Sequence, residues 1–311
     1  MIRIEGVSKL YGSAAVVDDV SLQIEGHSIC VIVGSSGSGK TTLLRMINRL
    51  VEPSRGRILV DGRNSAEEQP HLLRRRIGYV IQGHGLFPHR TVAQNIATVP
   101  TLLGWHAARI AERVEALLQA FQLDPAHFAD KYPHQLSGGQ QQRVGVARAL
   151  AAEPALLLMD EPYGALDPII RAKAQDDLLA IQRKFGTTIV LVTHDIDEAF
   201  RLGDRVAVMS AGKVLQVGRP AELLRRPANP LVAQMMGTSD RSLRLLSLTT
   251  AGEAAFAGTT AGPQVPASAS LRDVLSELIW RNADCATVLD DAGRPVGQLN
   301  IAAILARGRS D

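Results

Sequence analysis

Residues 28–47 read SICVIVGSSGSGKTTLLRMI, and this stretch decides the fold. An apolar run of strand length leads into Gly34–Thr41, which fits the pattern G-x-x-x-x-G-K-[ST], and an amphipathic helix follows. In such a loop the backbone N–H groups and the helix N-terminus surround one anion. We expect Lys40 to reach the β- and γ-phosphates of a nucleotide, and the Thr41 hydroxyl to bind Mg²⁺. The motif predicts nucleotide binding without separating the classes of protein that carry it.

Two further apolar runs, 155–159 and 188–192, have strand length and no alternation of polar residues. Such runs are typical of a parallel sheet buried on both faces. Helical patterns separate them, which predicts an α/β fold. Residues 91–150 carry no strand-like run, and we expect a helical subdomain there.

Polar residues follow several of these strands directly. Asp160 and Glu161 end the run that begins at Ala155, His194 ends another, and Gln82 follows a third at 77–81. The carboxyl ends of parallel strands meet at one sheet edge, where ligands bind. We therefore expect Asp160 to hold Mg²⁺ through water and Glu161 to act as general base on the attacking water. His194 is expected to contact the γ-phosphate, and Gln82 to be a ligand of Mg²⁺ or water.

Size and composition bound the function. A chain of 311 residues allows one large domain and a small one, and 46% hydrophobic with 21% charged residues is ordinary for a globular protein. A net charge of +3 does not indicate a nucleic-acid binder. No apolar run approaches the ~20 residues that span a bilayer, and the N-terminus lacks secretory-signal features. We expect a cytoplasmic chain, with Cys30 and Cys285 as buried small hydrophobes.

The pentapeptide Leu136-Ser137-Gly138-Gly139-Gln140 narrows the class. Ser137 is placed to cap a helix, and the glycines allow close backbone approach, so a second anion site is expected. Here the sequence resembles the ATP-binding cassette (ABC) family, whose signature is LSGGQ. The resemblance covers residues 1 to about 237, with the motifs in the family's order: Tyr11 as the adenine-stacking aromatic, the P-loop, Gln82, the signature, Asp160-Glu161, Gly164-Ala165-Leu166-Asp167 and His194. Gly164 departs from the Ser of many members.

This resemblance implies a P-loop NTPase fold with a parallel-sheet core plus antiparallel β and helical subdomains. It implies ATP hydrolysis with Mg²⁺ in a homodimer, where each signature completes the partner's ATP site. The implied ATP contacts are Tyr11, Gly34, Ser35, Ser36, Gly37, Ser38, Gly39, Lys40, Thr41 and Thr42. The implied catalytic residues are Glu161, His194, Lys40 and Gln82, the metal residues are Thr41, Gln82 and Asp160, and the dimer-interface loop is Ala165, Leu166 and Asp167.

Residues 83–105 and 132–135 resemble bacterial importers of glycine betaine, choline and related osmoprotectants. In the family this region docks the permease. The resemblance therefore implies separate permease subunits, a solute-binding protein that acts through the permease, and a peripheral position at the cytoplasmic face of the membrane. Two alternatives stay open. One is an importer of another small solute such as an amino acid, and the other is a non-transport ABC ATPase.

The composition changes after Gly237. Residues 240–268 are rich in Ser, Thr, Ala and Gly, which predicts a loosely structured connector. Residues 269–306 resemble a single CBS module, with a helix at 271–279, strands at 286–289 and 296–299 and a last short helix. The expected domains are therefore a cassette at 1–237, a connector at 238–268 and a CBS-like unit at 269–311. That unit is either a regulatory sensor or a packing domain.

Overall fold

The computed structural model describes residues 2–83, 85–164, 166–237 and 239–309. Their contacts divide the chain into two compact units, Met1–Val217 and Gly218–Asp311. Each unit has its own apolar core. Within the described residues, no helix combines the length and apolar character needed to cross a membrane.

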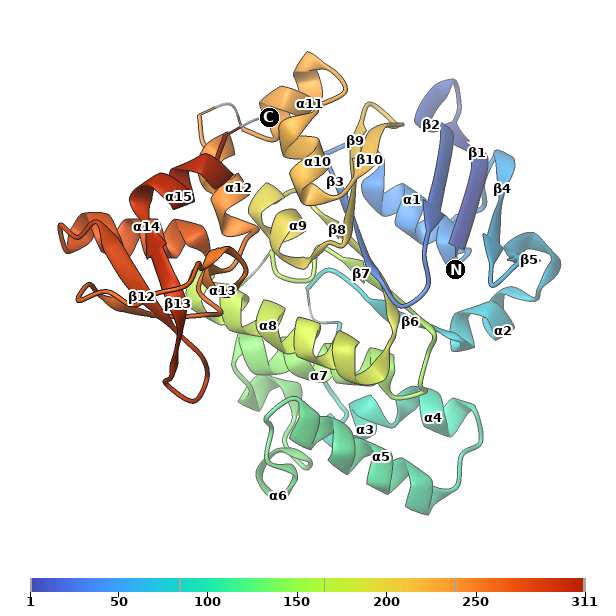
Figure 1. Cartoon of the computed structure of the whole chain (residues 1–311). Helices are drawn as coiled ribbons and strands as arrows, with labels where there is room; N and C mark the ends of the chain where they lie inside the picture. Colours follow the sequence, from blue (N-terminus) through green and yellow to red (C-terminus); the bar gives the residue numbers. More distant parts are fainter. Residues whose placement is uncertain (1, 84, 165, 238, 310–311) are drawn as a thin grey trace. The chain divides into compact units, whose positions relative to one another are not determined.

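The first unit is built on a six-stranded sheet in the order β10-β9-β3-β8-β7-β6 (Figure 1). The neighbours from β9 to β6 pair in parallel, and β3, β7 and β8 are buried at every position. Burial on both faces explains why these runs are continuously apolar. The strands are β3 (Ile29–Val33), β6 (Ile77–Val80), β7 (Leu156–Asp160), β8 (Thr188–Thr193), β9 (Arg205–Ser210) and β10 (Lys213–Gly218). The predicted parallel α/β core is confirmed.

A second, four-stranded sheet in the order β2-β1-β4-β5 is antiparallel. Helix α1 (Lys40–Ile47) lies between the two sheets and buries Leu43, Leu44 and Met46 in a core that both sheets share (Figure 1). Further elements of this unit are β1 (Ile2–Tyr11), β2 (Ala14–Ile24), β4 (Arg55–Val60), β5 (Arg63–Asn64), a 3₁₀ turn (Ser65–Glu67), α2 (Pro70–Arg75), α8 (Pro168–Phe185) and α9 (Ile196–Leu202).

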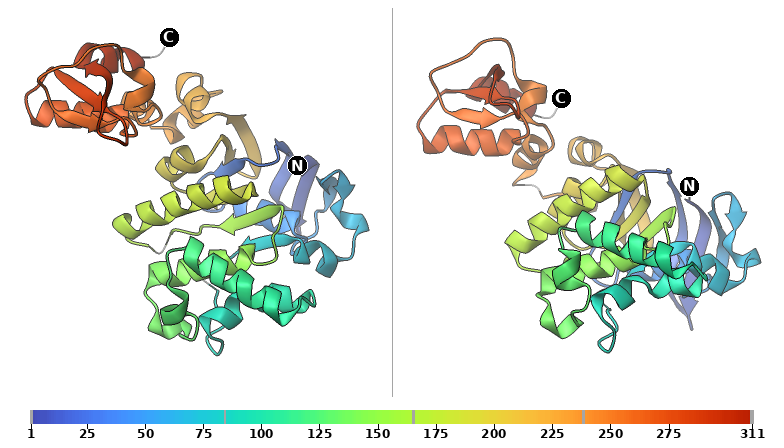
Figure 2. Two further views of the ribbon diagram at one scale, coloured as in Figure 1. Left: turned by 60° about the horizontal axis from the view of Figure 1, so that its bottom comes forward. Right: turned by 90° about the horizontal axis from the view of Figure 1, so that it is seen from below.

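The described residues between 91 and 150 contain helices and no strand, as the sequence predicts. The elements are α3 (Val92–Ile96), α4 (Thr98–Leu102), α5 (Ala107–Ala120), α6 (Pro125–Phe128), a 3₁₀ turn (Pro133–Gln135) and α7 (Gly138–Leu150). Helix α7 packs against both α3 and β6, so this group lies at the β6 edge of the sheet (Figure 2).

The second unit contains a three-stranded sheet, β11 (Gln264–Pro266), β12 (Cys285–Leu289) and β13 (Pro295–Asn300), with β11 parallel and β13 antiparallel to β12. The predicted strands at 286–289 and 296–299 are confirmed in β12 and β13. The helices are α10 (Pro220–Arg225), α11 (Pro230–Met235), α12 (Arg241–Ser247), α13 (Ala251–Ala254), α14 (Leu271–Trp280) and α15 (Ile301–Arg307). The predicted helix at 271–279 is α14.

The expectation of loose structure at 240–268 is wrong. This segment contains α12, α13 and β11, and it supplies Leu246, Ala251 and Val265 to the core of the second unit. Its polar residues act as caps, since the Thr250 side chain accepts from the backbone N–H of Glu253 at the start of α13. Short elements punctuated by Ser, Thr and Gly produce a turn-like composition even where each element is packed.

The two cysteines differ in burial. Cys30 is buried in β3, where burial raises the pKa of its thiol to about 12. Cys285 at the start of β12 is partly exposed. The expectation of a buried small hydrophobe therefore holds for Cys30. Cys285 is less buried because it is the first residue of its strand.

Candidate functional site

The P-loop connects β3 to α1. Gly39 ends the loop with a left-handed φ of 97°, and a Cβ placed there would lie 2.4 Å from the backbone oxygen of Val16. Only glycine fits both conditions, which explains the residue at this step of the motif. Helix α1 then begins at Lys40 and directs its first free N–H groups toward the loop.

Lys40 is held inside the loop that it serves. Its side chain is 4% exposed, and Nζ donates hydrogen bonds to the backbone oxygens of Gly34 and Ser35, both at 2.8 Å. Burial lowers the pKa of Lys40, while the charges of Glu161 and Asp160 oppose that shift. The buried Ser38 hydroxyl has no hydrogen-bond partner among the described residues. A cation and an unused donor thus face the loop, and an anion between them would satisfy both.

Asp160 lies at the end of β7 and is joined to the P-loop helix. The Thr41 hydroxyl donates to one carboxylate oxygen of Asp160 at 2.8 Å. The other oxygen lies 3.4 Å from the Tyr79 hydroxyl and 3.5 Å from a guanidinium nitrogen of Arg45. The Asp160 side chain is 3% exposed. Hydroxyl and carboxylate oxygens are ligands that suit Mg²⁺, and Mg²⁺ takes the rest of its shell from phosphate and water.

Three expected catalytic side chains converge beside this pair. The Gln82 amide lies 3.5 Å from Oε2 of Glu161, and Nδ1 of His194 lies 3.3 Å from the same oxygen. Glu161 has a φ of 45°, which is uncommon for a residue with a side chain. Such strain costs on the order of 1 kcal/mol and gathers at active sites. Its backbone N–H donates to Val192 in β8, which anchors the turn.

A buried carboxyl that sequence reasoning missed, Glu198, bonds to Thr193, the residue before His194. Thr193 donates through its hydroxyl to the carboxyl of Glu198 in α9. Burial is the main cause that raises the pKa of Glu198 to about 7; the Thr193 bond opposes this rise, the charge of Asp195 adds to it, and Arg171 and a Gln175 hydrogen bond oppose it. Asp195 caps α9 through two backbone N–H groups. The sequence does show a glutamate, Glu198, four residues after His194, and this spacing could have indicated a carboxyl on the helix that follows the strand.

The signature segment begins α7. The Ser137 side chain accepts from the backbone N–H of Gln140, and the Gln140 side chain accepts from the N–H of Ser137, which is a full capping box. A Cβ at Gly139 would lie 2.5 Å from the Cγ2 atom of Ile170, so the start of α7 touches the first turn of α8. Among the described residues, no hydrogen bond or ion pair joins Ser137 to the P-loop.

The remaining expected residues take separate places. Tyr11 ends β1 and is 53% exposed, with the Lys9 ammonium 5.1 Å from its ring centre. Ala165 lies outside the described residues, whereas Leu166 is buried and Asp167 caps α8 by accepting from two backbone N–H groups.

A cavity of about 400 Å³, the edge cavity, opens beside β6. Tyr79 of β6, Phe87, Val99 of α4 and Arg148 of α7 contribute to its wall, and Arg74 of α2 does as well. Arg148 donates to the backbone oxygen of Gly85 at 2.8 Å, which ties the segment after Gln82 to α7. The wall combines apolar side chains with Arg74, Arg75 and Arg148, a composition suited to a helical or extended segment of another chain.

The fold and this site together define a P-loop nucleotide-binding ATPase. The family description "ABC transporter" matches residues 17–164. The chain is 48% identical over 306 residues to the glycine betaine uptake system ATP-binding protein YehX of Escherichia coli, covering 98% of this chain and 99% of that protein. It is 45% identical to the osmoprotectant import ATP-binding protein OsmV of Salmonella typhimurium, covering 96% and 78% of the two chains.

A dimeric, post-hydrolysis structure of the ATP-binding cassette MJ0796 bound to ADP and Pi is also similar, with a TM-score of 0.63 and 32% identity. The match covers 70% of this chain and 98% of that one. The chain therefore belongs to the ABC transporter ATP-binding family. It is an ATPase subunit that binds nucleotide.

Proposed function

We propose that this chain hydrolyses ATP to drive uptake of quaternary-ammonium osmoprotectants, of the glycine betaine and choline type, through separate permease subunits. The observation that carries the proposal is the end-to-end match to the E. coli glycine betaine uptake protein, which includes the second unit as well as the cassette. A match over the cassette alone would support only the shared ATPase chemistry.

The P-loop residues bind the nucleotide phosphates in this proposal. Lys40 exchanges its bonds to the backbone oxygens of Gly34 and Ser35 for phosphate oxygens, and Ser38 gains a partner for its buried hydroxyl. Tyr11, exposed at the end of β1, is available to stack on the adenine. We further propose that Gly34, Ser35, Ser36, Gly37, Gly39, Thr41 and Thr42 complete this site.

Mg²⁺ fits the residues that are present. Thr41 and Asp160 offer oxygens that already face each other at 2.8 Å, and Gln82 adds a polar group nearby. Mg²⁺ bound with ATP neutralises charge on the phosphates. No group of three or more His, Cys, Asp or Glu side chains with metal-site geometry occurs in the described part of the chain, so the phosphates must supply the rest of the shell.

Glu161 is the proposed general base. Its carboxylate can accept a proton from an attacking water, and its position beside the buried end of β7 restricts solvent around it. His194 and Gln82 both approach Oε2 of this carboxylate and are placed to orient the water and the γ-phosphate.

A second copy of the chain completes the site. The signature, residues 136–140, offers a capped helix start with no link to its own P-loop among the described residues. In the homodimer that we propose, this helix start contacts the γ-phosphate bound by the partner, and the loop of Ala165, Leu166 and Asp167 lies in the interface. ATP then favours the closed dimer, and its hydrolysis favours opening.

The permease binds in the edge cavity in this proposal, and a solute-binding protein delivers solute to the permease. The chain would therefore lie at the cytoplasmic face of the membrane. We propose that the second unit, in which 240–268 packs with the CBS-like residues 269–309, is either a regulatory sensor or a packing domain.

The test is uptake of labelled glycine betaine by cells that lack their own importer ATPase and carry the cognate permease. The cells receive either this chain or its Glu161→Gln form. Uptake that returns only with the intact glutamate supports the proposal. Equal uptake with both forms overturns the substrate assignment, leaves the ATPase assignment in place, and directs the assay to labelled amino acids and other small solutes.

A further inference from the structure

Tyr79 links two parts of the cassette. Its hydroxyl lies 3.4 Å from the Asp160 carboxylate, and the residue also contributes to the wall of the edge cavity. Tyr79 is half-buried in β6, the outermost strand of the sheet on this side. One residue therefore touches both the proposed metal site and the cavity.

Arg45 completes a small cluster around the carboxylate. Its guanidinium lies 3.5 Å from Asp160, and a hydrogen bond to Tyr79 is the main cause that raises the pKa of Arg45. The Thr41 hydroxyl occupies the opposite carboxylate oxygen. Asp160 is thus held at one oxygen by Thr41 and at the other by Tyr79 and Arg45. A carboxylate bonded at both oxygens has little freedom to rotate.

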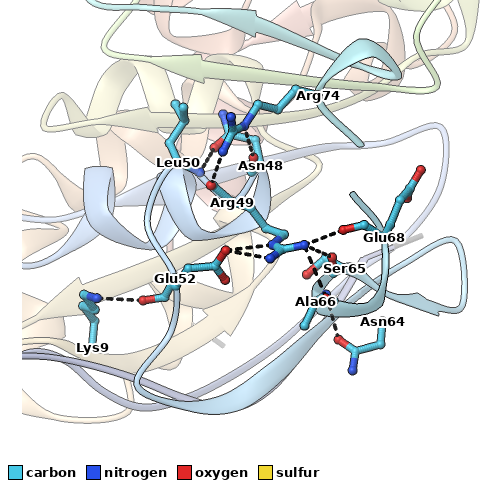
Figure 3. Close-up of polar contacts among 10 residues, drawn as sticks. All are labelled: Lys9, Asn48, Arg49, Leu50, Glu52, Asn64, Ser65, Ala66, Glu68 and Arg74. Atoms are coloured by element: carbon cyan, nitrogen blue, oxygen red, sulfur yellow. Dashed lines mark hydrogen bonds and ion pairs between the residues drawn. The ribbon is translucent and has the colours of Figure 1, made fainter. Parts of the chain in front are cut away.

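A second side chain from the cavity wall reaches the far end of the same helix. Nε of Arg74 donates to the backbone oxygen of Asn48 at 3.1 Å, and another nitrogen of its guanidinium donates to the backbone oxygen of Arg49 (Figure 3). Arg49 in turn bonds to Glu52 and to the backbone oxygen of Ser65. The two bonds from Arg74 occupy backbone carbonyls just past the C-terminus of α1, so Arg74 fixes the end of the P-loop helix.

We propose that Tyr79 is a positioning residue that orients Asp160 for Mg²⁺ from the wall of the edge cavity, so that occupancy of the cavity and Mg²⁺ binding are linked. The proposal rests on the proposed function for the occupant of the cavity and goes beyond it in naming the residue that carries the link. If a segment bound in the cavity shifts Tyr79, the affinity for Mg²⁺ changes. By reciprocity, bound Mg²⁺ changes the binding free energy of that segment by the same amount.

The first test compares ADP binding by the full chain in Mg²⁺ and in EDTA, by calorimetry, for the wild type and Tyr79→Phe. We expect Tyr79→Phe to lose about three- to tenfold of the affinity gained from Mg²⁺, the size of one hydrogen bond. ADP affinity in EDTA stays at the wild-type value. The matched control is Ser276→Ala, which removes the hydroxyl of an exposed residue in the second unit and leaves both affinities unchanged.

Two outcomes would overturn this part. A full Mg²⁺ gain in Tyr79→Phe removes the hydroxyl from any positioning role. An equal loss in Mg²⁺ and EDTA shows that the residue supports the loop as a whole. If the wild type itself binds no ADP, the proposed function fails, and that result is distinct from either of these.

The second test measures the link to the cavity. Thr98, another residue of the cavity wall, is changed to Cys in a Cys285→Ser background, where the remaining Cys30 is buried. The thiol is titrated with Ellman's reagent in the presence of ADP, with Mg²⁺ or with EDTA. We expect Mg²⁺ to change the rate of modification, and Tyr79→Phe to abolish that difference. A Mg²⁺ effect that persists in Tyr79→Phe assigns the link to another route and overturns this part of the proposal.

Discussion

The cassette contains two helix starts that suit an anion, and they are built differently. The P-loop surrounds a lysine that is 4% exposed, and its threonine is bonded to a buried carboxylate. The signature exposes Ser137 and Gly138, and its helix start is closed by the capping box between Ser137 and Gln140. The first site has charge, depth and polar partners, and the second has the dipole and free N–H groups of a helix.

This difference indicates a division of work. A helix terminus alone contributes about 0.3–1 kcal/mol to anion binding at an exposed position, whereas a charge-assisted contact contributes about 1.5–3 kcal/mol. The P-loop can therefore bind nucleotide by itself, and the signature can only add to a nucleotide that is already held. Four single substitutions test this contrast, from the largest expected effect to the smallest, and a mixture of two of them gives a fifth test.

Glu161→Gln tests the chemistry at the P-loop half. We expect phosphate release to fall by at least ~100-fold, since a general base contributes about 10²–10⁴ in rate. ATP affinity stays at the wild-type value, because Lys40 and Thr41 are unchanged. Release of phosphate is measured beside equilibrium binding of ATP. The exposed Glu112→Gln serves as control and keeps full activity. Hydrolysis at the wild-type rate would remove Glu161 from the role of base.

Lys40→Ala tests the binding strength of the same half. Losing one charge-assisted contact should weaken ATP binding about 10- to 100-fold. A fluorescent ATP analogue gives the dissociation constant, and the exposed Lys173→Ala serves as the matched control. An unchanged constant would mean that the backbone of the loop carries the binding without this cation.

Glu198→Gln tests the buried carboxyl that accepts a hydrogen bond from Thr193, the residue before His194. The folded-state pKa of about 7 lies above the ordinary value of 4.5, so the protonated carboxyl favours the folded state. Its contribution is fully present below about pH 4.5 and is lost as pH rises through 7. We expect the wild type to lose about 1–2 kcal/mol of stability between pH 6 and pH 9 through this group, and Glu198→Gln to lack that loss. Denaturant unfolding at several pH values measures it, and identical profiles would contradict the assignment.

Ser137→Ala tests the signature half. Removing the cap should cost about 1 kcal/mol at the start of α7, leave nucleotide affinity of the chain unchanged, and lower turnover. Turnover is measured by phosphate release, and ATP affinity is measured at protein concentrations where the chain is monomeric; a reduced affinity there would place the signature at its own P-loop and break the contrast.

Mixing variants sharpens the same point. A dimer of one Lys40→Ala chain and one Ser137→Ala chain contains one composite site in which both elements are intact. We expect the mixture to hydrolyse ATP faster than the mean of the two separate variants. A rate equal to that mean would mean that the two elements do not act across a dimer.

Much of the cassette could be predicted because its signals are local. The apolar runs at 155–159 and 188–192 correspond to β7 and β8. A strand buried on both faces is apolar at every position, and a continuous apolar run of this length predicts it directly. The helix cap at Ser137 also follows from a neighbour three residues away, Gln140. The segment at 240–268 defeated the same reasoning, because its packing depends on Val265 and Leu246 meeting residues far along the chain.

The site could be predicted as a set of residues but not as a geometry. Strand order brings Gln82, Glu161 and His194 to one point, and that order is a property of the whole sheet. Tyr79 and Arg45 gave no motif signal, since their role arises from contacts between a strand and a helix that are distant in sequence. Lys40 folding back onto its own loop was likewise outside what a pattern can indicate.

The contact between Gly139 and Ile170 limits how this sequence can vary. A side chain at Gly139 would collide with Ile170, which is 38% exposed and belongs to the helix that Asp167 caps. A lineage that gains a Cβ at 139 therefore needs either a shift of the Ile170 side chain or a smaller residue at 170. Substitutions at positions 139 and 170 are therefore expected to depend on each other. Drift on the surface of α8 is constrained by a glycine thirty-one residues earlier, in a different motif.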